Sequence, residues 1–220
     1  MVEINDIAIA SLPAVLRPET LMQGHWPLAD HAEPYCRALD GVGVHQASGL
    51  LTLYVDGRVE SLVRETGIPR LWLDTLRSLL DHHRYRAIPV SKLPGMPEAF
   101  HKVLRQRELR RSDALIMASR TREQRACLAV EAGVPVGEVD QLTTFLDLTR
   151  KPGIKEVKAA LFMSAGLRSL RDLGQQDPEP FRQQLETLIR EKGLQRAVPT
   201  PKEVRSDVCW ARVYPAIFDL

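Results

Sequence analysis

The sequence predicts an all-α protein in which three tandem repeats pack into one elongated array of helices. First, the segments 62–81 and 128–147 are identical at eight aligned positions. Second, helix-capping patterns are frequent, whereas the alternating apolar runs typical of strands are scarce. Third, a glycine-containing turn lies upstream of each copy. Self-similarity of this kind is typical of stacked units that bury their apolar faces against one another.

The first 35 residues are expected to form an acidic N-terminal extension, 1–35. They carry five carboxylates and one arginine, a net charge of −4, and four prolines interrupt them. We expect this extension to pack on the first repeat or to be partly mobile. Residues 4–10 are the only stretch that could form a strand, and a short helix fits them equally well.

The two clearest copies predict the same arrangement of helix, turn and helix. Gly67 and Gly133 occupy the same place in the pattern E-x-G-[IV]-P, so each is expected to lie at the end of a helix with a positive φ. A third, weaker copy begins at Glu191. The expected organisation is a first helical repeat at 36–90, two further repeats at 91–215, and a C-terminal tail at 216–220.

Several helix starts in the second half of the chain have typical capping residues. Two capping boxes and one Asp-Pro step are present: Thr121 with Gln124, Thr200 with Glu203, and Asp177 with Pro178. The helix that begins after Asp177 is expected to run to Lys192 and to stop at Gly193, because glycine favours the left-handed conformation that ends helices.

Composition narrows the class of protein. Apolar residues make up 44% and charged residues 26% of the chain, and the net charge of +2 gives no global attraction to nucleic acid or membrane. The three cysteines are far apart and form no CxxC pair, which favours reduced thiols and a cytoplasmic location. No apolar run reaches the ~18–20 residues of a membrane span. The acidic N-terminus lacks the positive region of a signal peptide.

Glycine turns at residues 40–43, 93–97 and 151–155 are candidate anion-binding sites. Glycines spaced as h-G-h-G between two helices permit positive φ and leave backbone N–H groups at the start of the second helix. Together with the helix dipole, such N–H groups can hold a DNA phosphate without reading the bases. The first turn, Gly41-Val42-Gly43, fits this pattern fully.

These turns resemble helix-hairpin-helix motifs, and a larger part of the chain resembles one family. The segments that carry the resemblance are LPGMPEAFHKVL, ACLAVEAGVP, DLTRKPGIKEVKAALFMSAGLRSLRDLG and VPTPKEVRSDVCWA. Over about residues 88–215 the chain is similar to the bacterial domain-of-unknown-function family 4332. The resemblance implies helix-hairpin-helix repeats and supplies no activity. The internal repeat extends the same unit upstream to Leu39.

Positive charge and the complete glycine pattern lie on different repeats. The later glycine is replaced by Pro97 in the second turn and by Lys155 in the third, and proline has no N–H to donate. Residues 82–111 carry eight lysines and arginines against two glutamates, a net charge of +6. Alternatively, the turns are structural joints and the arginines form a solvated helix face. The candidate nucleic-acid-binding residues are Gly41, Gly43, Gly95, Gly153, Lys102, Arg105, Arg107, Arg110, Arg111 and Lys155.

No pattern in the chain predicts catalytic residues, a metal site or a cofactor. The triplet Asp81-His82-His83 superficially matches a metal-phosphoesterase motif, but it ends an amphipathic helix and its counterpart reads Asp147-Leu148-Thr149. His25, His31 and Cys36 could contribute metal ligands, but a structural zinc needs four ligands at compact spacings.

We therefore expect a non-enzymatic binding protein. The sequence favours a sequence-independent nucleic-acid binder that uses the glycine turns and the basic helical patch. The alternative is a protein–protein adaptor or scaffold in which the hairpins are purely structural joints. The sequence leaves the oligomeric state and the physiological ligand open, and it does not place the glycine turns and the basic residues on one face.

Overall fold

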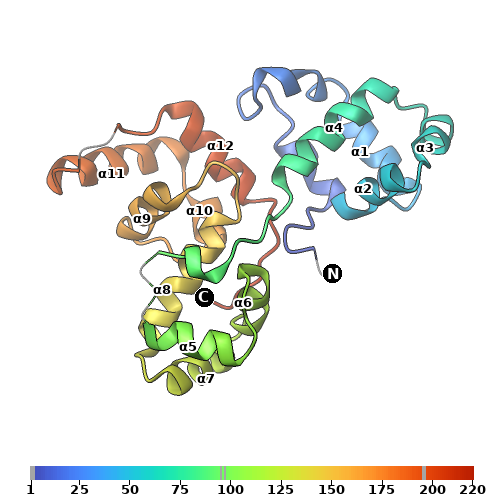
Figure 1. Ribbon diagram of the computed structural model, residues 1–220. Helices are drawn as coiled ribbons and strands as arrows, with labels where there is room; N and C mark the ends of the chain where they lie inside the picture. The colour runs from blue at the N-terminus through green and yellow to red at the C-terminus, as the bar shows by residue number, and fades with distance from the viewer. Residues whose placement is uncertain (1–2, 95, 97, 195–196) are drawn as a thin grey trace. The chain divides into compact units, whose positions relative to one another are not determined.

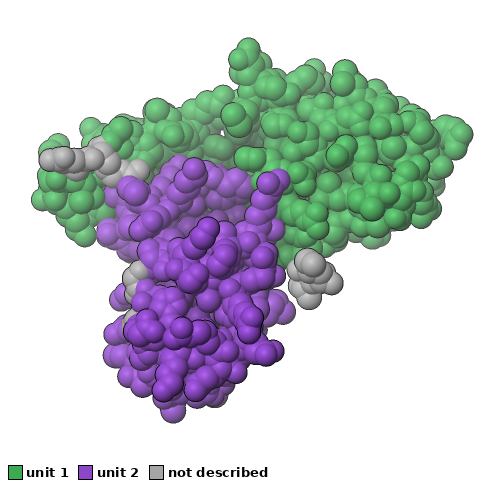
Figure 2. All heavy atoms as spheres, viewed as in Figure 1, with its two compact units in different colours: residues 1–84, 174–215 green, residues 85–173, 216–220 purple. Residues whose placement is uncertain are grey.

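The computed structural model describes residues 3–94, 96, 98–194 and 197–220, and it is drawn in Figure 1. Within these residues every regular element is a helix, which confirms the predicted all-α fold class. The only strand-like pairings among them are two isolated antiparallel bridges, Ala8 with Gln46 and Pro89 with Arg111. The chain divides into two compact units, which are coloured separately in Figure 2. The repeat boundaries expected from the sequence remain a prediction.

Unit 1 comprises residues 1–84 and 174–215. Its 3-10 and α-helices are η1 (Ile9–Ala14), η2 (Gln23–Leu28), α1 (Ala32–Gly41), α2 (Ala47–Val55), α3 (Val59–Thr66), α4 (Arg70–His83), α11 (Pro178–Glu191) and α12 (Pro201–Ala211). The helix α10 (Leu170–Gln175) spans the boundary between the units. Leucine is the most frequent residue in the core of unit 1, and isoleucine, valine and alanine supply most of the remainder, as the low aromatic content requires.

Unit 2 comprises residues 85–173 and 216–220. Its helices are η3 (Val90–Lys92), α5 (Glu98–Gln106), α6 (Ser112–Ala118), α7 (Arg122–Ala132), α8 (Val136–Thr149) and α9 (Glu156–Ser164). Helix α8 is central to this unit, because it packs against α6, α7 and α9. Its buried side chains include Val139, Leu146 and Leu148.

The acidic N-terminal extension is packed into unit 1 over its described residues. Ile7, Ile9 and Leu12 are fully buried, and η1 packs against α1. The strand and helix alternatives for residues 4–10 each hold in part, since Ala8 forms a bridge and the 3-10 helix η1 begins at Ile9. The apolar residues of the extension therefore serve as core, despite its net negative charge.

The helix ends predicted from the sequence are confirmed. Both capping boxes form, with the Thr121 and Thr200 hydroxyls accepting from the amides of Gln124 and Glu203. Helix α11 begins after the predicted cap Asp177 and ends at Glu191, one residue before the predicted end at Lys192, and Gly193 follows with φ 59°. These helix ends could be predicted from the sequence because a cap depends only on residues close to it in the chain.

Gly67 and Gly133 end α3 and α7 with φ values of 70° and 63°, as predicted. Replacing either glycine by valine is expected to cost about 1–2 kcal/mol, because a β-branched side chain is strained in this conformation. Urea unfolding curves measure the cost. Gly137 is the matched control, since it lies in α8 without a positive φ and with open space around it. Gly137→Val should not destabilise, and an unchanged midpoint for Gly67→Val would contradict the strain argument.

Candidate functional site

The first glycine turn closes the C-terminal end of α1. Gly41 is the last residue of that helix, and Gly43 has a φ of 83°. The amides of Val42 and Val44 donate to the Leu39 carbonyl at 3.2 and 3.0 Å, and the Gly43 amide donates to the Asp40 carbonyl at 3.0 Å. These three N–H groups are therefore engaged within the chain.

A carboxylate of the chain occupies the N-terminus of α2, which is where the sequence suggested a phosphate. Asp6 accepts from the Ser48 amide at 2.9 Å and from the Ser48 hydroxyl at 2.8 Å. The Ala47 amide donates to the Ile7 carbonyl at 2.9 Å. Residues of the acidic extension thus accept hydrogen bonds from the first amides of α2. The sequence did not predict these bonds, because their partners are far apart in the chain.

The other two glycine turns belong to unit 2. Gly95 of the second turn lies outside the described residues. In the third turn, Gly153 is exposed with a φ of 89°, and the Ile154 amide donates to the Lys151 carbonyl at 3.1 Å. Lys155 is exposed at the N-cap position of α9.

Five of the predicted cations lie together around the connection between α5 and α6. We call this set the basic turn; all its side chains are exposed, and its members are Lys102, Arg105, Arg107, Arg110 and Arg111. The predicted glycines Gly41 and Gly43 belong to unit 1, whereas the basic turn belongs to unit 2. Gly153 and Lys155 lie on a separate turn, between α8 and α9.

Carboxylates accompany the basic turn, and one of them, Glu131, is distant in sequence. Arg105 pairs with Glu98 at 3.2 Å and Arg111 with Asp113 at 3.5 Å. Arg107 forms a two-point contact with Glu131 of α7, which raises the pKa of Arg107 and lowers the pKa of Glu131 through hydrogen bonding. Residues 82–111 alone therefore overstate the positive charge of this surface.

The basic turn and the first glycine turn share two backbone hydrogen bonds and a residue with positive φ. The Glu108 amide donates to the Arg105 carbonyl at 3.1 Å, and the Leu109 amide donates to the Leu104 carbonyl at 2.8 Å. Glu108 has a positive φ of 57°, and Gly43, at the corresponding position, has a positive φ of 83°. The positions 104, 105, 108 and 109 thus correspond in order to 39, 40, 43 and 44 of the first turn. Basic side chains and glycines therefore occupy equivalent turns in the two units.

Charge is distributed unequally between the units. Residues 85–173 and 216–220 contain 16 lysines and arginines against 11 aspartates and glutamates, a net charge of +5. Residues 1–84 and 174–215 contain 14 against 17, a net charge of −3. The small net charge of the whole chain hides this difference, so any attraction to a polyanion belongs to unit 2.

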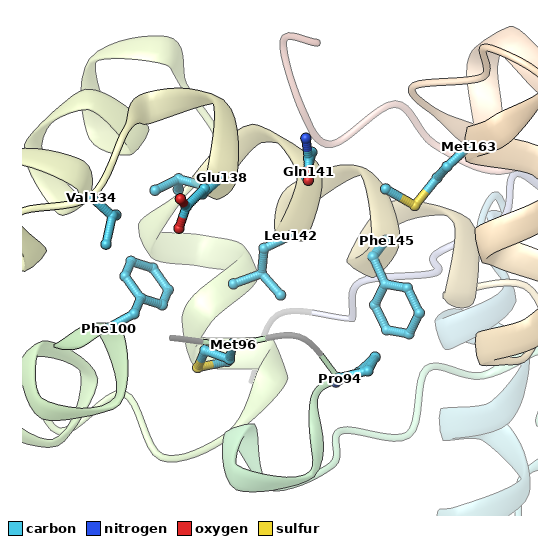
Figure 3. A pocket seen from close by; sticks show the side chains of 10 residues that line it. Pro94, Met96, Phe100, Val134, Glu138, Gln141, Leu142, Phe145 and Met163 are labelled. Atoms are coloured by element: carbon cyan, nitrogen blue, oxygen red, sulfur yellow. The ribbon is translucent and has the colours of Figure 1, made fainter. Parts of the chain in front are cut away.

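An apolar pocket that was not predicted from the sequence lies along α8 in unit 2. The cavity of about 480 Å³ is within the usual range for binding sites. Figure 3 shows Leu142 and Phe145 of α8 directed toward Met96 and Pro94 across the cavity. The remaining lining consists of Phe100, Val134, Val139 and Met163, with the exposed polar residues Glu138 and Gln141.

The Asp81-His82-His83 triplet has a structural environment in unit 1. The His83 ring is buried and stacks on Trp210 with ring centres 3.6 Å apart, and its Nδ1 lies 2.7 Å from the Tyr214 hydroxyl. Within the described ranges, no three His, Cys, Asp or Glu side chains come close enough together to hold a metal ion. Nor does any described helix combine the length and apolarity that crossing a membrane requires.

Comparison with known proteins identifies one family. A family model described as Domain of unknown function (DUF4332) matches residues 94–212, more than half of the chain. The match begins in the second glycine turn and ends just after α12. Searches of the curated proteins and of the solved structures found no match.

Proposed function

The chain belongs to the family described as Domain of unknown function (DUF4332), and from its own residues we propose that it is a non-enzymatic, sequence-independent nucleic-acid-binding protein. The observation that carries this proposal is the basic turn. Four exposed arginines, Arg105, Arg107, Arg110 and Arg111, lie at the end of α5 and in the connection to α6, in a unit with a net charge of +5. Arginine is suited to this role because its planar donors match phosphate oxygens.

The ion pairs at the basic turn are compatible with phosphate binding. The Arg105 and Glu98 side chains are 70% and 84% exposed. Exposed pairs of this kind contribute only ~0–1 kcal/mol, so a phosphate can replace the carboxylate at little cost. The first glycine turn contributes less to the proposal, because its amides already donate to α1. Exposed Lys155, beside Gly153, is a second candidate contact in the same unit.

Replacing all four arginines of the basic turn by alanine should flatten the salt dependence of DNA binding. Each lost phosphate contact lowers the slope of log K against log salt by about 0.9 for duplex DNA and about 0.7 for single strands. We expect micromolar binding by the parent at low salt, and a loss of at least about tenfold in the variant. Fluorescence anisotropy with labelled duplex and single-stranded DNA between about 50 and about 200 mM salt, the range over which such binding falls steeply, gives both quantities.

The matched control removes the same charge from unit 1. Its variant carries alanine at four exposed arginines, Arg58, Arg64, Arg190 and Arg205. This control should retain the parent's slope. Equal losses of DNA affinity in both variants would mean that net charge alone explains the binding. DNA binding by the basic-turn variant equal to that of the parent would rule out the proposed interface.

The second candidate function is that of a protein–protein adaptor, and the open apolar pocket along α8 favours it. Phe145 and Leu142 are only half-buried there, although they belong to the central helix of the unit. Protein partners that co-purify after nuclease treatment would support this candidate if the Phe145→Asp variant no longer retains them. The nucleic-acid assay does not depend on these residues, so the two candidates can be separated.

A further inference from the structure

A similar segment lies near the start of each unit. Residues 7–13 read IAIASLP, and residues 88–94 read IPVSKLP. Each makes the same pair of hydrogen bonds to residues at and just before the start of α2 or α6. The Ile9 amide donates to the His45 carbonyl and the Val90 amide to the Arg110 carbonyl, at 2.9 and 3.0 Å. In return, Ile7 and Ile88 accept from the amides of Ala47 and Ser112, at 2.9 and 2.8 Å.

The four helices that follow also correspond. The helices α1 to α4 have the same order as α5 to α8, and their first residues, 32, 47, 59 and 70, correspond to 98, 112, 122 and 136. Helices α4 and α8 have the same length and follow proline N-caps with φ of −57° and −59°. From these matches we infer that residues 7–83 and 88–149 are structurally equivalent modules.

The modules differ in one connection. Between the shared segment and the next helix, unit 1 has the long connection 14–31, whereas unit 2 has only 95–97. The long connection of unit 1 contains η2, which packs against α4. Leu16, Leu21 and Leu28 of this connection are at most 2% exposed. The carbonyl of Asp30 accepts from the Trp72 indole N–H of α4 at 3.2 Å.

The pocket lies on the face of α8 that corresponds to the covered face of α4. Ile68, Trp72, Leu76 and Leu79 are all buried in unit 1. In the alignment that matches 62–81 with 128–147, their counterparts are Val134, Glu138, Leu142 and Phe145, and all four line the pocket of Figure 3. The open pocket in unit 2 thus coincides with the absence of the long connection.

We propose that the pocket along α8 is the docking site for a short, apolar helical segment of a partner protein. This segment would cover α8 as residues 14–31 cover α4. A second copy of the chain is a poor source of the segment, because its own residues 14–31 already bury Leu16, Leu21 and Leu28 in unit 1. Helix-in-groove binding of this kind relies on a few apolar anchors at helical spacing.

The partner segment carries a lysine or arginine next to its apolar anchors. In unit 1 the indole of Trp72 donates a hydrogen bond to the covering segment. Glu138 stands at the equivalent position in unit 2, and an ionised carboxylate can only accept. The direction of the hydrogen bond is therefore reversed, and a cationic donor satisfies it best. This inference deepens the adaptor candidate and does not depend on nucleic-acid binding.

A synthetic peptide tests the proposal directly. The probe is a fluorescein-labelled peptide with the sequence of residues 14–31 in which Asp30→Lys supplies the cation opposite Glu138. Anisotropy titration with the full chain is expected to give saturable binding, about tenfold tighter than for the unchanged peptide. In the protein, Phe145→Asp should weaken binding of the probe at least tenfold, and Glu138→Arg should abolish the preference for the lysine peptide.

Two controls make the outcome decisive. Glu191→Arg reverses an exposed charge at the end of α11 in unit 1 and should leave binding of the probe unchanged. Circular dichroism reports whether Phe145→Asp folds, and Glu138→Arg, at an exposed position, remains informative if it does not.

Absence of saturable binding, or equal binding by the parent and by Glu138→Arg, would overturn the proposal. So would a concentration-dependent dimer that Phe145→Asp dissociates, since a second copy would then be the occupant. If the Phe145→Asp variant still retains co-purifying protein partners, the adaptor function would stand but this pocket would be excluded as its site.

Discussion

Replacing Asp147 by alanine is expected to destabilise the protein by about 3–5 kcal/mol, because it removes one partner of a buried ion pair. The Asp147 and Arg150 side chains are 4% and 1% exposed. One carboxylate oxygen of Asp147 accepts from Arg150 Nε at 2.9 Å and Nη2 at 2.7 Å, and the other accepts from the Leu170 amide at 2.7 Å. The aspartate therefore neutralises a buried guanidinium and caps α10 from a different helix.

Urea unfolding of the full chain measures this loss, and the repeat provides its matched control. Asp81 is the counterpart of Asp147 in the first copy but is exposed. We expect Asp81→Ala to cost less than about 1 kcal/mol, as is usual at surface positions. Asp147→Asn, which retains an acceptor for Leu170, should fall between the two. Equal midpoints for Asp81→Ala and Asp147→Ala would contradict the buried-pair argument.

This pair of aspartates also illustrates what the sequence could and could not predict. The repeat correctly predicted that Gly67 and Gly133 have the same backbone conformation, since that property is local. It could not predict that identical residues, Asp81 and Asp147, differ in burial. Burial depends on which segments cover each helix, and Asp147 is reached by the start of α10, which lies beyond α9 in the chain.

The first glycine turn did not predict unpaired N–H groups correctly, again because tertiary contacts decide which groups are paired. Its pattern correctly predicted a positive φ at Gly43. The partners of the N–H groups at α2 come from the N-terminal extension, where Asp6 accepts from Ser48 although α1 separates the two in the chain. An acidic composition was evident in that extension, but its pairing with a helix N-terminus is a tertiary contact.

The sequence contained part of the information on which the apolar pocket depends. The shared segments at Ile7 and Ile88 are further apart in the chain than the two helical copies are. A comparison at a single offset loses the first match, because the connection of unit 1 is longer than that of unit 2. Aligning both segments shows from the sequence alone that unit 2 lacks the long connection. That this connection covers α4, and that its absence leaves Leu142 and Phe145 open, required the structure.

Replacing Arg125 by methionine is expected to destabilise the protein by about 2–4 kcal/mol and to release the C-terminal tail. The Arg125 side chain is 4% exposed and pairs with Asp140 at 2.6 Å and Asp219 at 2.7 Å. It also donates to the carbonyls of Ser119, Arg120 and Asp219. Because both carboxylates are about half exposed, they regain water when the arginine is removed, which makes the cost smaller than at Asp147.

The tail residue Asp219 provides an independent readout of the same cluster. Partial burial would raise the pKa of Asp219, but hydrogen bonds from Arg125 and from the Arg122 amide hold it below its usual value. A depressed pKa stabilises the fold above the unfolded-state pKa, and this contribution is lost as pH falls through the folded-state value. Removal of Arg125 should therefore reduce the acid sensitivity of unfolding that Asp219 contributes.

A double-mutant cycle with Arg125→Met and Asp219→Ala isolates the contact between helix α7 and the tail. We expect a coupling of about 0.5–3 kcal/mol, the range for residues in direct contact. Arg122→Ala is the matched control, because the backbone amide of Arg122 bonds to Asp219 while its side chain is exposed. That control should change the unfolding midpoint little. Additive effects of the Arg125 and Asp219 substitutions would mean that the guanidinium stabilises unit 2 through Asp140 and the carbonyls alone, without holding the tail.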